Sequence, residues 1–104
     1  MRVVVADDDR VTTTVLVHAL KKWDIDVSVA HDGGTAWELL SSGPPVSMAI
    51  VDWEMPGLDG ISLCQRVRSR PSLAGLYLIL LTGRSSRLDL VTGLEAGEIG
   101  RAHV

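Results

Sequence analysis

The sequence predicts an α/β domain in which helices cover both faces of a mainly parallel sheet. Short apolar runs alternate with longer amphipathic stretches in a β-α-β-α-β-α-β-α order. The 104 residues, of which 46% are hydrophobic, suffice for one domain with a real core. Right-handed crossovers leave few topologies for this order, and binding sites in such sheets lie at the carboxyl ends of the strands.

The first strand is predicted over Val3–Ala6, a β-branched run typical of a buried parallel strand. Apolar residues recur near helical spacing in the stretch that follows, which predicts a helix from about Arg10 to Trp23. Alternation of apolar and polar residues predicts a second strand over Ile25–Ala30. The apolar positions of the helix are Val11, Val15, Leu16, Ala19, Leu20 and Trp23.

The second helix is predicted to open at a capping box, in which Thr35 is followed three residues later by Glu38. The sequence Gly43-Pro44-Pro45 ends that helix, because proline cannot continue it. Ser47–Val51 is then predicted as the third strand, and the Pro- and Gly-containing stretch 52–60 as a loop.

The remaining elements follow the same signals. Ile61–Arg68 is predicted as a helix that Pro71 ends, with Ile61, Cys64 and Val67 on one face. Leu76–Leu81 is predicted as a fourth buried strand. A second capping box at Ser86 predicts a fourth helix beyond it.

Polar residues follow three of the predicted strands. Asp7, Asp8 and Asp9 follow the first, Asp52 follows the third and Thr82 follows the fourth. An aspartate after a strand is often only the cap of the next helix, and we expect that role for Asp9. If the three strands are neighbours, however, several carboxylates converge and repel one another. A divalent cation offsets such repulsion, and oxygen-only ligands suit Mg²⁺.

Four segments resemble the receiver domain of bacterial response regulators. The resemblance implies a flavodoxin-like, doubly wound parallel sheet with strand order 2-1-3-4-5. Spacings of 44 residues from Asp8 to Asp52 and 30 from Asp52 to Thr82 also match that family. The segments are Val5 to Asp9, Val51 to Gly60, Leu80 to Gly83 and Gly93 to Gly97.

The resemblance also implies a role for each site residue. Asp52 is the phosphoacceptor, which attacks a phosphohistidine of a sensor histidine kinase or phosphotransfer protein. Asp7, Asp8 and Asp52 hold Mg²⁺ together with the backbone carbonyl of Glu54, and the metal neutralises charge on the phosphoryl group. Thr82 donates a hydrogen bond to a phosphoryl oxygen and moves inward as the switch.

Composition excludes several other classes of function. The net charge of −3 gives no basic footprint for nucleic acid, and no apolar run approaches the roughly 20 residues of a membrane span. The single cysteine, Cys64, rules out an internal disulfide. We therefore expect a cytoplasmic signalling domain of a two-component phosphorelay, not an enzyme beyond self-catalysed phosphotransfer and dephosphorylation.

The sequence departs from the family near its end. The lysine of the family's fifth strand falls at Val104, and the only lysines are Lys21 and Lys22. We expect residues 1–97 to be an incomplete receiver domain, with the fifth strand and last helix missing or replaced. Residues 98–104 are expected to be a non-family tail. From Ile99 on, the codons ATC GGA AGA GCA CAC GTC would encode it and resemble a sequencing adapter, so an output domain would be lost with the C-terminus.

Two alternatives to phosphotransfer remain open. The missing lysine favours a degenerate receiver that acts only as a protein-interaction module, whereas the intact acids oppose it. An aspartyl-nucleophile phosphatase usually has a second aspartate two residues after its nucleophile. Glu54 stands at that position in this sequence.

Overall fold

The computed structural model describes residues 1–81 of the chain. Its four strands form one parallel sheet in the order β2-β1-β3-β4, which confirms the predicted fold class. The predicted fourth helix and any fifth strand lie outside the described residues. In chain order the elements are β1 (Arg2–Ala6), α1 (Arg10–Lys21), β2 (Asp26–Ala30), α2 (Gly33–Ser42), β3 (Met48–Asp52), α3 (Gly60–Arg68), a 3-10 turn η1 (Pro71–Leu73) and β4 (Tyr77–Leu81).

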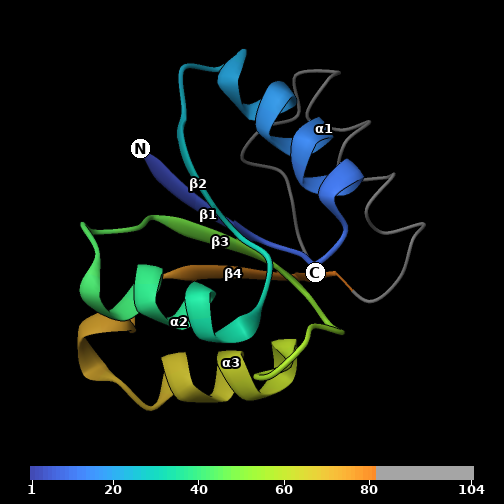
Figure 1. The fold of residues 1–104 in the computed structure, drawn as a ribbon. Helices are drawn as coiled ribbons and strands as arrows, with labels where there is room; N and C mark the ends of the chain where they lie inside the picture. Colours follow the sequence, from blue (N-terminus) through green and yellow to red (C-terminus); the bar gives the residue numbers. More distant parts are fainter. Residues whose placement is uncertain (82–104) are drawn as a thin grey trace.

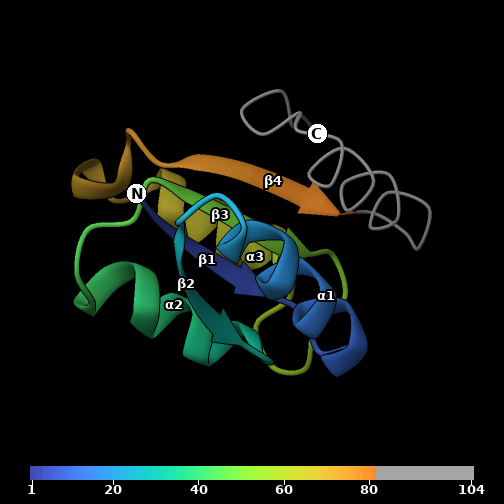
Figure 2. The ribbon, with the colours of Figure 1, turned by 90° about the horizontal axis from the view of Figure 1, so that it is seen from above.

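The helices form layers on both faces of the sheet. Helix α1 covers one face, and α2 and α3 cover the other (Figures 1 and 2). Side chains of a strand alternate between the faces, so β1 contributes to two separate cores. Val3 and Val5 pack with Leu16 and Leu20 of α1, whereas Val4 packs among the residues of α2 and α3. The carboxyl ends of β1 and β3 therefore meet at one edge between these layers.

Each described α-helix is preceded by an aspartate that serves as its N-cap. The carboxylates of Asp9, Asp32 and Asp59 accept hydrogen bonds from backbone N–H groups in the first turns of α1, α2 and α3. These bonds favour the charged carboxylate and lower the pKa of Asp32 and of Asp59. The expected role of Asp9 as a helix cap is confirmed.

The predicted capping box at Thr35 is wrong. Helix α2 begins two residues earlier, at Gly33, and its N-cap is Asp32. Thr35 donates its backbone N–H and its hydroxyl to Asp32, with distances of 2.7 and 3.0 Å. Thr35 therefore lies in the first turn and donates to the cap, and Asp32 is the cap because a charged carboxylate is the stronger acceptor at the N-cap position.

The buried face of α1 also differs from the apolar pattern. Leu16, Ala19 and Leu20 are buried as predicted, but Val11 is 72% exposed. The helix ends at Lys21, and Trp23 lies in the turn beyond it, followed by Asp24 with a left-handed φ of 58°. Val11 therefore lies on the solvent side of α1 although it fits the helical spacing, because the sheet covers only the stripe that Leu16 and Leu20 occupy.

Helix α3 packs through Leu63 and Val67, while Cys64 and Ile61 are only partly buried. Burial raises the pKa of the Cys64 thiol, although the positive charge of Arg68 opposes this. The thiol therefore stays protonated and behaves as a small apolar side chain. None of the helices within residues 1–81 combines the length and apolarity needed to cross a membrane.

Candidate functional site

Three carboxylates meet at the carboxyl edge of the sheet. Asp7 directly follows β1, Asp8 comes next, and Asp52 is the last residue of β3. Because β1 and β3 are hydrogen-bonded neighbours, one oxygen atom from each of the three side chains lies within 4.8 Å of the others. The structure thus brings together the three acids that the sequence analysis assigned to one site.

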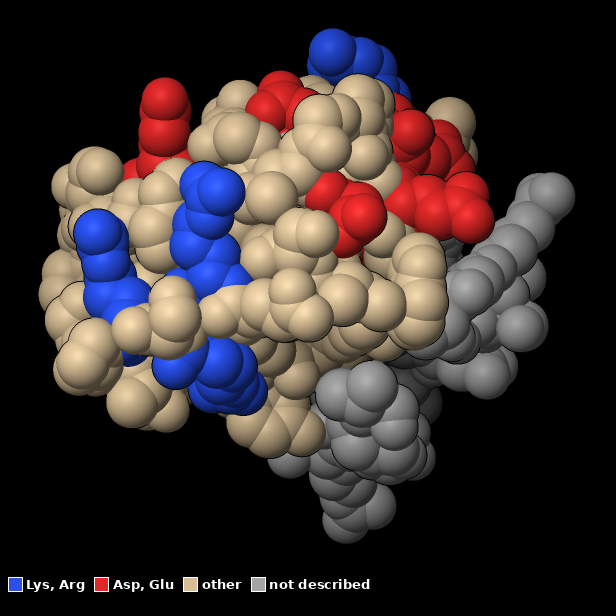
Figure 3. Space-filling view, turned by 90° about the horizontal axis from the view of Figure 1, so that it is seen from below, with Lys and Arg blue, Asp and Glu red and all other residues tan. Residues whose placement is uncertain are grey.

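The three carboxylates differ in their access to solvent. Asp7 is 1% exposed and Asp52 is 3% exposed, whereas Asp8 is exposed. Two buried carboxylates beside a third are costly unless hydrogen bonds or a cation compensate their charge. In Figure 3, several acidic side chains gather over one side of the molecule, and a group of Lys and Arg side chains lies over the other.

Backbone hydrogen bonds hold Asp7 in place. Its N–H donates to the carbonyl of Ala30 at 3.0 Å, and its Oδ1 accepts from the N–H of Asp9 at 2.9 Å. The carbonyl oxygen of Asp7 lies 3.0 Å from Nδ1 of His31. A carbonyl oxygen can only accept, so His31 carries a proton on Nδ1. The residues after β1 and after β2 are therefore tied together at the site.

His31 is a site neighbour that sequence reasoning missed. The chain has three histidines, His18, His31 and His103, and nothing in their spacing singles out one of them. The available signal was its place directly after β2, since the same strand-end rule that selected Asp7 and Asp52 applies to it.

Asp52 and the loop after it are anchored on both sides. Asp52 pairs in register with Leu81 of β4, and the N–H of Trp53 donates to the carbonyl of Leu81 at 2.9 Å. The carbonyl of Trp53 accepts from the N–H of Gly60 at 3.0 Å, where α3 begins. Backbone hydrogen bonds thus hold both ends of the β3–α3 loop, residues 53–59.

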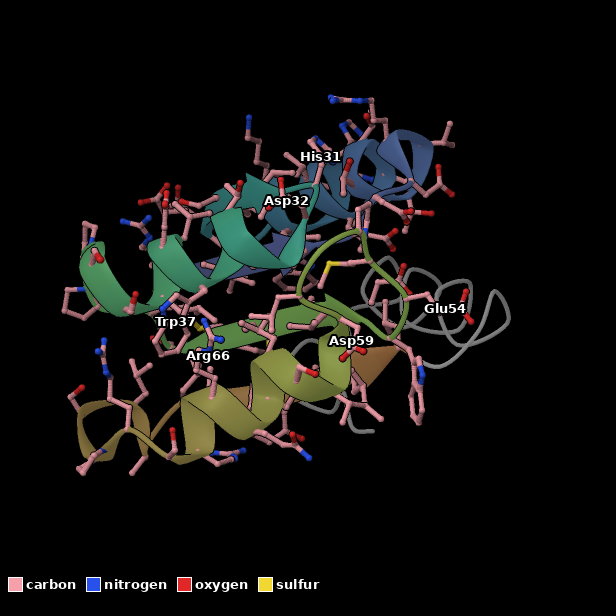
Figure 4. The ribbon with its side chains drawn as sticks, turned by 60° about the horizontal axis from the view of Figure 1, so that its bottom comes forward. His31, Asp32, Trp37, Glu54, Asp59 and Arg66 are labelled. Carbon is pink, nitrogen blue, oxygen red and sulfur yellow. The ribbon has the colours of Figure 1, made fainter. Side chains whose placement is uncertain are left out.

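Glu54 lies in this loop, and its side chain is exposed (Figure 4). Thr82, the remaining predicted site residue, lies outside the described residues. The strand that precedes it in sequence, β4, is the neighbour of β3, as the prediction required.

The chemistry of the donor set fits a hard divalent cation. All three side chains offer carboxylate oxygens, and these are close enough to share one ion. Oxygen ligands of this kind suit Mg²⁺ or Mn²⁺, and the exposure of Asp8 leaves a path for an ion that keeps some of its waters.

Comparison with known proteins points to one family. The family model described as "Response regulator receiver domain" matches residues 3–100. A candidate response regulator from Chloroflexus aurantiacus J-10-fl is 30% identical, with a TM-score of 0.75, over 92% of this chain and 78% of that one.

Two further solved structures share the fold. The N-terminal domain of a response regulator receiver protein from Methanoculleus marisnigri JR1 has a TM-score of 0.73 at 24% identity, over 80% of this chain and 67% of that one. The Mn²⁺-bound form of response regulator Rcp1 has a TM-score of 0.73 at 15% identity, over 99% of this chain and 97% of that one.

Proposed function

The chain belongs to the response regulator receiver domain family, and on this premise we propose that Asp52 accepts a phosphoryl group from a phosphohistidine. The observation that carries the proposal is the position of Asp52: it ends β3, is 3% exposed and lies within 4.8 Å of two other carboxylates. Receiver domains are signalling modules of two-component systems, so the donor would be a sensor histidine kinase or a phosphotransfer protein.

In the proposed transfer, an Oδ atom of Asp52 attacks phosphorus as the phosphorus–nitrogen bond of the phosphohistidine breaks. The product is an acyl phosphate on Asp52 and a neutral histidine on the donor after protonation. The fixed backbone on both sides of Asp52 supports this role, because a held nucleophile loses little freedom on reaction.

Asp7, Asp8, Asp52 and the backbone carbonyl of Glu54 would hold Mg²⁺. When bound, the ion would offset negative charge on the transferring phosphoryl group. The bonds that fix Asp7 to Ala30 and Asp9 would orient its carboxylate toward the cluster. Support comes from the three clustered carboxylates and from the Mn²⁺-bound state of Rcp1, a protein of the same fold.

Thr82 completes the proposed site. By resemblance to the family, its hydroxyl donates a hydrogen bond to a phosphoryl oxygen and moves inward on phosphorylation. The protein then acts in the cytoplasm as a phosphoacceptor, with no enzymatic activity beyond transfer to and hydrolysis from its own aspartate. Residues 1–97 would form the receiver part.

A second candidate function is a degenerate receiver that only binds partners. The observation in its favour is the lysine content, because Lys21 and Lys22 are the only lysines in the sequence. Lys21 is the last residue of α1, whose first turn follows the acidic cluster, so it lies at the other end of that helix. No lysine of the described residues is therefore near Asp52.

Phosphorylation by a small-molecule phosphodonor in the presence of Mg²⁺ separates the two functions. We expect one acid-labile phosphate, which mass mapping places on Asp52, and none in Asp52→Ala. Asp59→Asn is the matched control, because it removes a carboxylate from the same loop while keeping a side chain that can cap α3. A phosphate undiminished in Asp52→Ala would remove Asp52 from the role, and no phosphate in the parent would favour the degenerate receiver.

A further inference from the structure

The start of helix α2 lies directly against the loop that follows Asp52. Gly33, the first residue of α2, is buried, and its N–H donates to the carbonyl of Pro56 at 3.5 Å. A Cβ atom added at Gly33 would overlap the carbonyl oxygen of Leu58 and lie 2.7 Å from the Cβ of Leu58. Only a residue without a side chain permits this approach of two backbones. Figure 4 shows the loop passing the start of α2, where Asp32 is labelled.

Of the two segments in contact, the loop is the one that can yield. Helix α2 is anchored by Ala36 and Leu40, which are buried in the core beneath the sheet. The loop is anchored in this core by Met55 and, in part, by Leu58, but its other side chains are exposed. Gly57 adopts a positive φ of 73° with open space around it. A side chain at position 33 would therefore push the loop away and leave the helix in place.

We infer that Gly33 is a positioning residue for the cation site. By letting the β3–α3 loop close against α2, it sets where the backbone carbonyl of Glu54 lies relative to Asp52. This inference rests on the proposed function, in which that carbonyl is a cation ligand. It makes the start of α2 part of the support of the site, although no atom of α2 is itself a proposed ligand.

Three single substitutions distinguish positioning from ordinary packing. Gly33→Ala introduces the overlap with Leu58. Gly34→Ala is the matched control, because a Cβ there meets nothing closer than Oδ1 of Asp32 at 3.4 Å. Leu40→Ala removes a buried side chain from the same helix and reports what general destabilisation does.

The measurement is the affinity for Mg²⁺ by titration calorimetry, well below the melting temperature of each variant, together with the melting temperature itself. We expect Gly33→Ala to bind Mg²⁺ about 10-fold more weakly, as loss of a group that supports a metal ligand commonly does. We expect Gly34→Ala to match the parent in Mg²⁺ affinity and to melt no lower, because alanine favours a helix more than glycine does. Leu40→Ala should melt at a lower temperature and keep the parent's affinity.

A second variant covers the case in which Gly33→Ala does not fold. Leu58 is partly buried against the α2–α3 core, and Leu58→Ala loosens the loop from its own side without any new overlap. It too should bind Mg²⁺ more weakly than the parent.

Parent-like Mg²⁺ affinity in folded Gly33→Ala, or in Leu58→Ala if that is the variant that folds, would overturn the inference. An equal loss of affinity in Leu40→Ala would also overturn it, because the effect would then be general destabilisation. Failure of the parent itself to bind Mg²⁺ is a different result, since it would contradict the cation site of the proposed function.

Discussion

Asp8 differs from the other two clustered carboxylates in its access to solvent. Its side chain is exposed, whereas those of Asp7 and Asp52 are almost fully buried. Removing Asp7 would also leave the N–H of Asp9 without its carboxylate acceptor. Asp8 is therefore the member of the cluster whose removal changes the charge of the site with the least disturbance of the fold.

We expect Asp8→Ala to weaken Mg²⁺ binding by at least about 10-fold, because loss of a direct ligand should cost no less than loss of an outer partner. Without Mg²⁺ the variant should melt no lower than the parent, since one source of repulsion is gone. Calorimetric titration and thermal melting measure the two quantities. Glu38→Ala, an exposed acid on α2, is the control of equal charge change, and equal affinities in Asp8→Ala and Glu38→Ala would contradict the assignment.

At the scale of the element, the aspartate caps make helix stability depend on pH. The pKa of Asp59 lies below its ordinary value because the backbone N–H of Ser62, 2.8 Å from Oδ1, donates to the charged carboxylate. A group whose pKa is lowered on folding contributes stability above its unfolded pKa. That contribution disappears as the pH falls through the folded pKa. The α3 cap is thus expected to weaken in acid.

We expect Asp59→Asn to reduce the dependence of unfolding free energy on pH in the acid range. Asparagine can still cap the helix but does not titrate. The difference in stability between the parent and the variant should therefore shrink as the pH is lowered from about 5 to about 2. Denaturant unfolding at several pH values measures it, and a difference that stays constant over this range would show that the cap does not titrate.

Helices α2 and α3 are also joined by ring contacts on the surface. The guanidinium carbon of Arg66 on α3 lies 5.5 Å from the centroid of the Trp37 ring, and that of Arg70, just beyond the end of α3, lies 5.0 Å from it. Figure 4 shows Trp37 of α2 and Arg66 of α3 facing each other across the two helices. Each contact of this kind at an exposed site contributes about 0.5–1 kcal/mol.

A double-mutant cycle of Trp37→Leu and Arg66→Gln tests the cation–π contact between these two residues. We expect a coupling free energy of about 0.5–1 kcal/mol that favours the parent pair. Urea unfolding of the four proteins provides the free energies. Additive effects of the two substitutions would show that the ring and the guanidinium do not interact in solution.

At the scale of the whole molecule, one sheet serves two hydrophobic layers. Leu20 belongs to the layer beneath α1, and Leu63 to the layer beneath α2 and α3. Both side chains are fully buried. Strands β1 and β3 contribute alternate residues to each layer. If one layer unfolded, the other would lose the strands that it packs against.

We therefore expect Leu20→Ala and Leu63→Ala each to destabilise the fold by about 2–5 kcal/mol. In both variants, far-ultraviolet circular dichroism and tryptophan fluorescence should report the same midpoint, as in two-state unfolding. Separate midpoints for the two probes would show that the layers unfold independently.

Which of these features a sequence can predict depends on how local their cause is. Strands and helices followed from short-range patterns, and the meeting of Asp7, Asp8 and Asp52 needed only the additional rule that parallel strands end at one edge. The approach of Gly33 to Leu58 joins segments 25 residues apart, and neither periodicity nor the strand-end rule encodes it. The buried side of α1 was misjudged because Val11 is apolar yet faces solvent.

The alternation of β1 between two layers constrains how the protein can change in length. Val3 and Val5 serve one layer and Val4 the other, and Asp7 follows at a fixed count after them. Loss or gain of one residue within β1 would exchange the side chains on one side of the change between the layers, or else displace Asp7 from the site. Insertions and deletions are therefore expected to be tolerated in exposed connections, such as the one containing Pro44 and Pro45, and to be eliminated from β1.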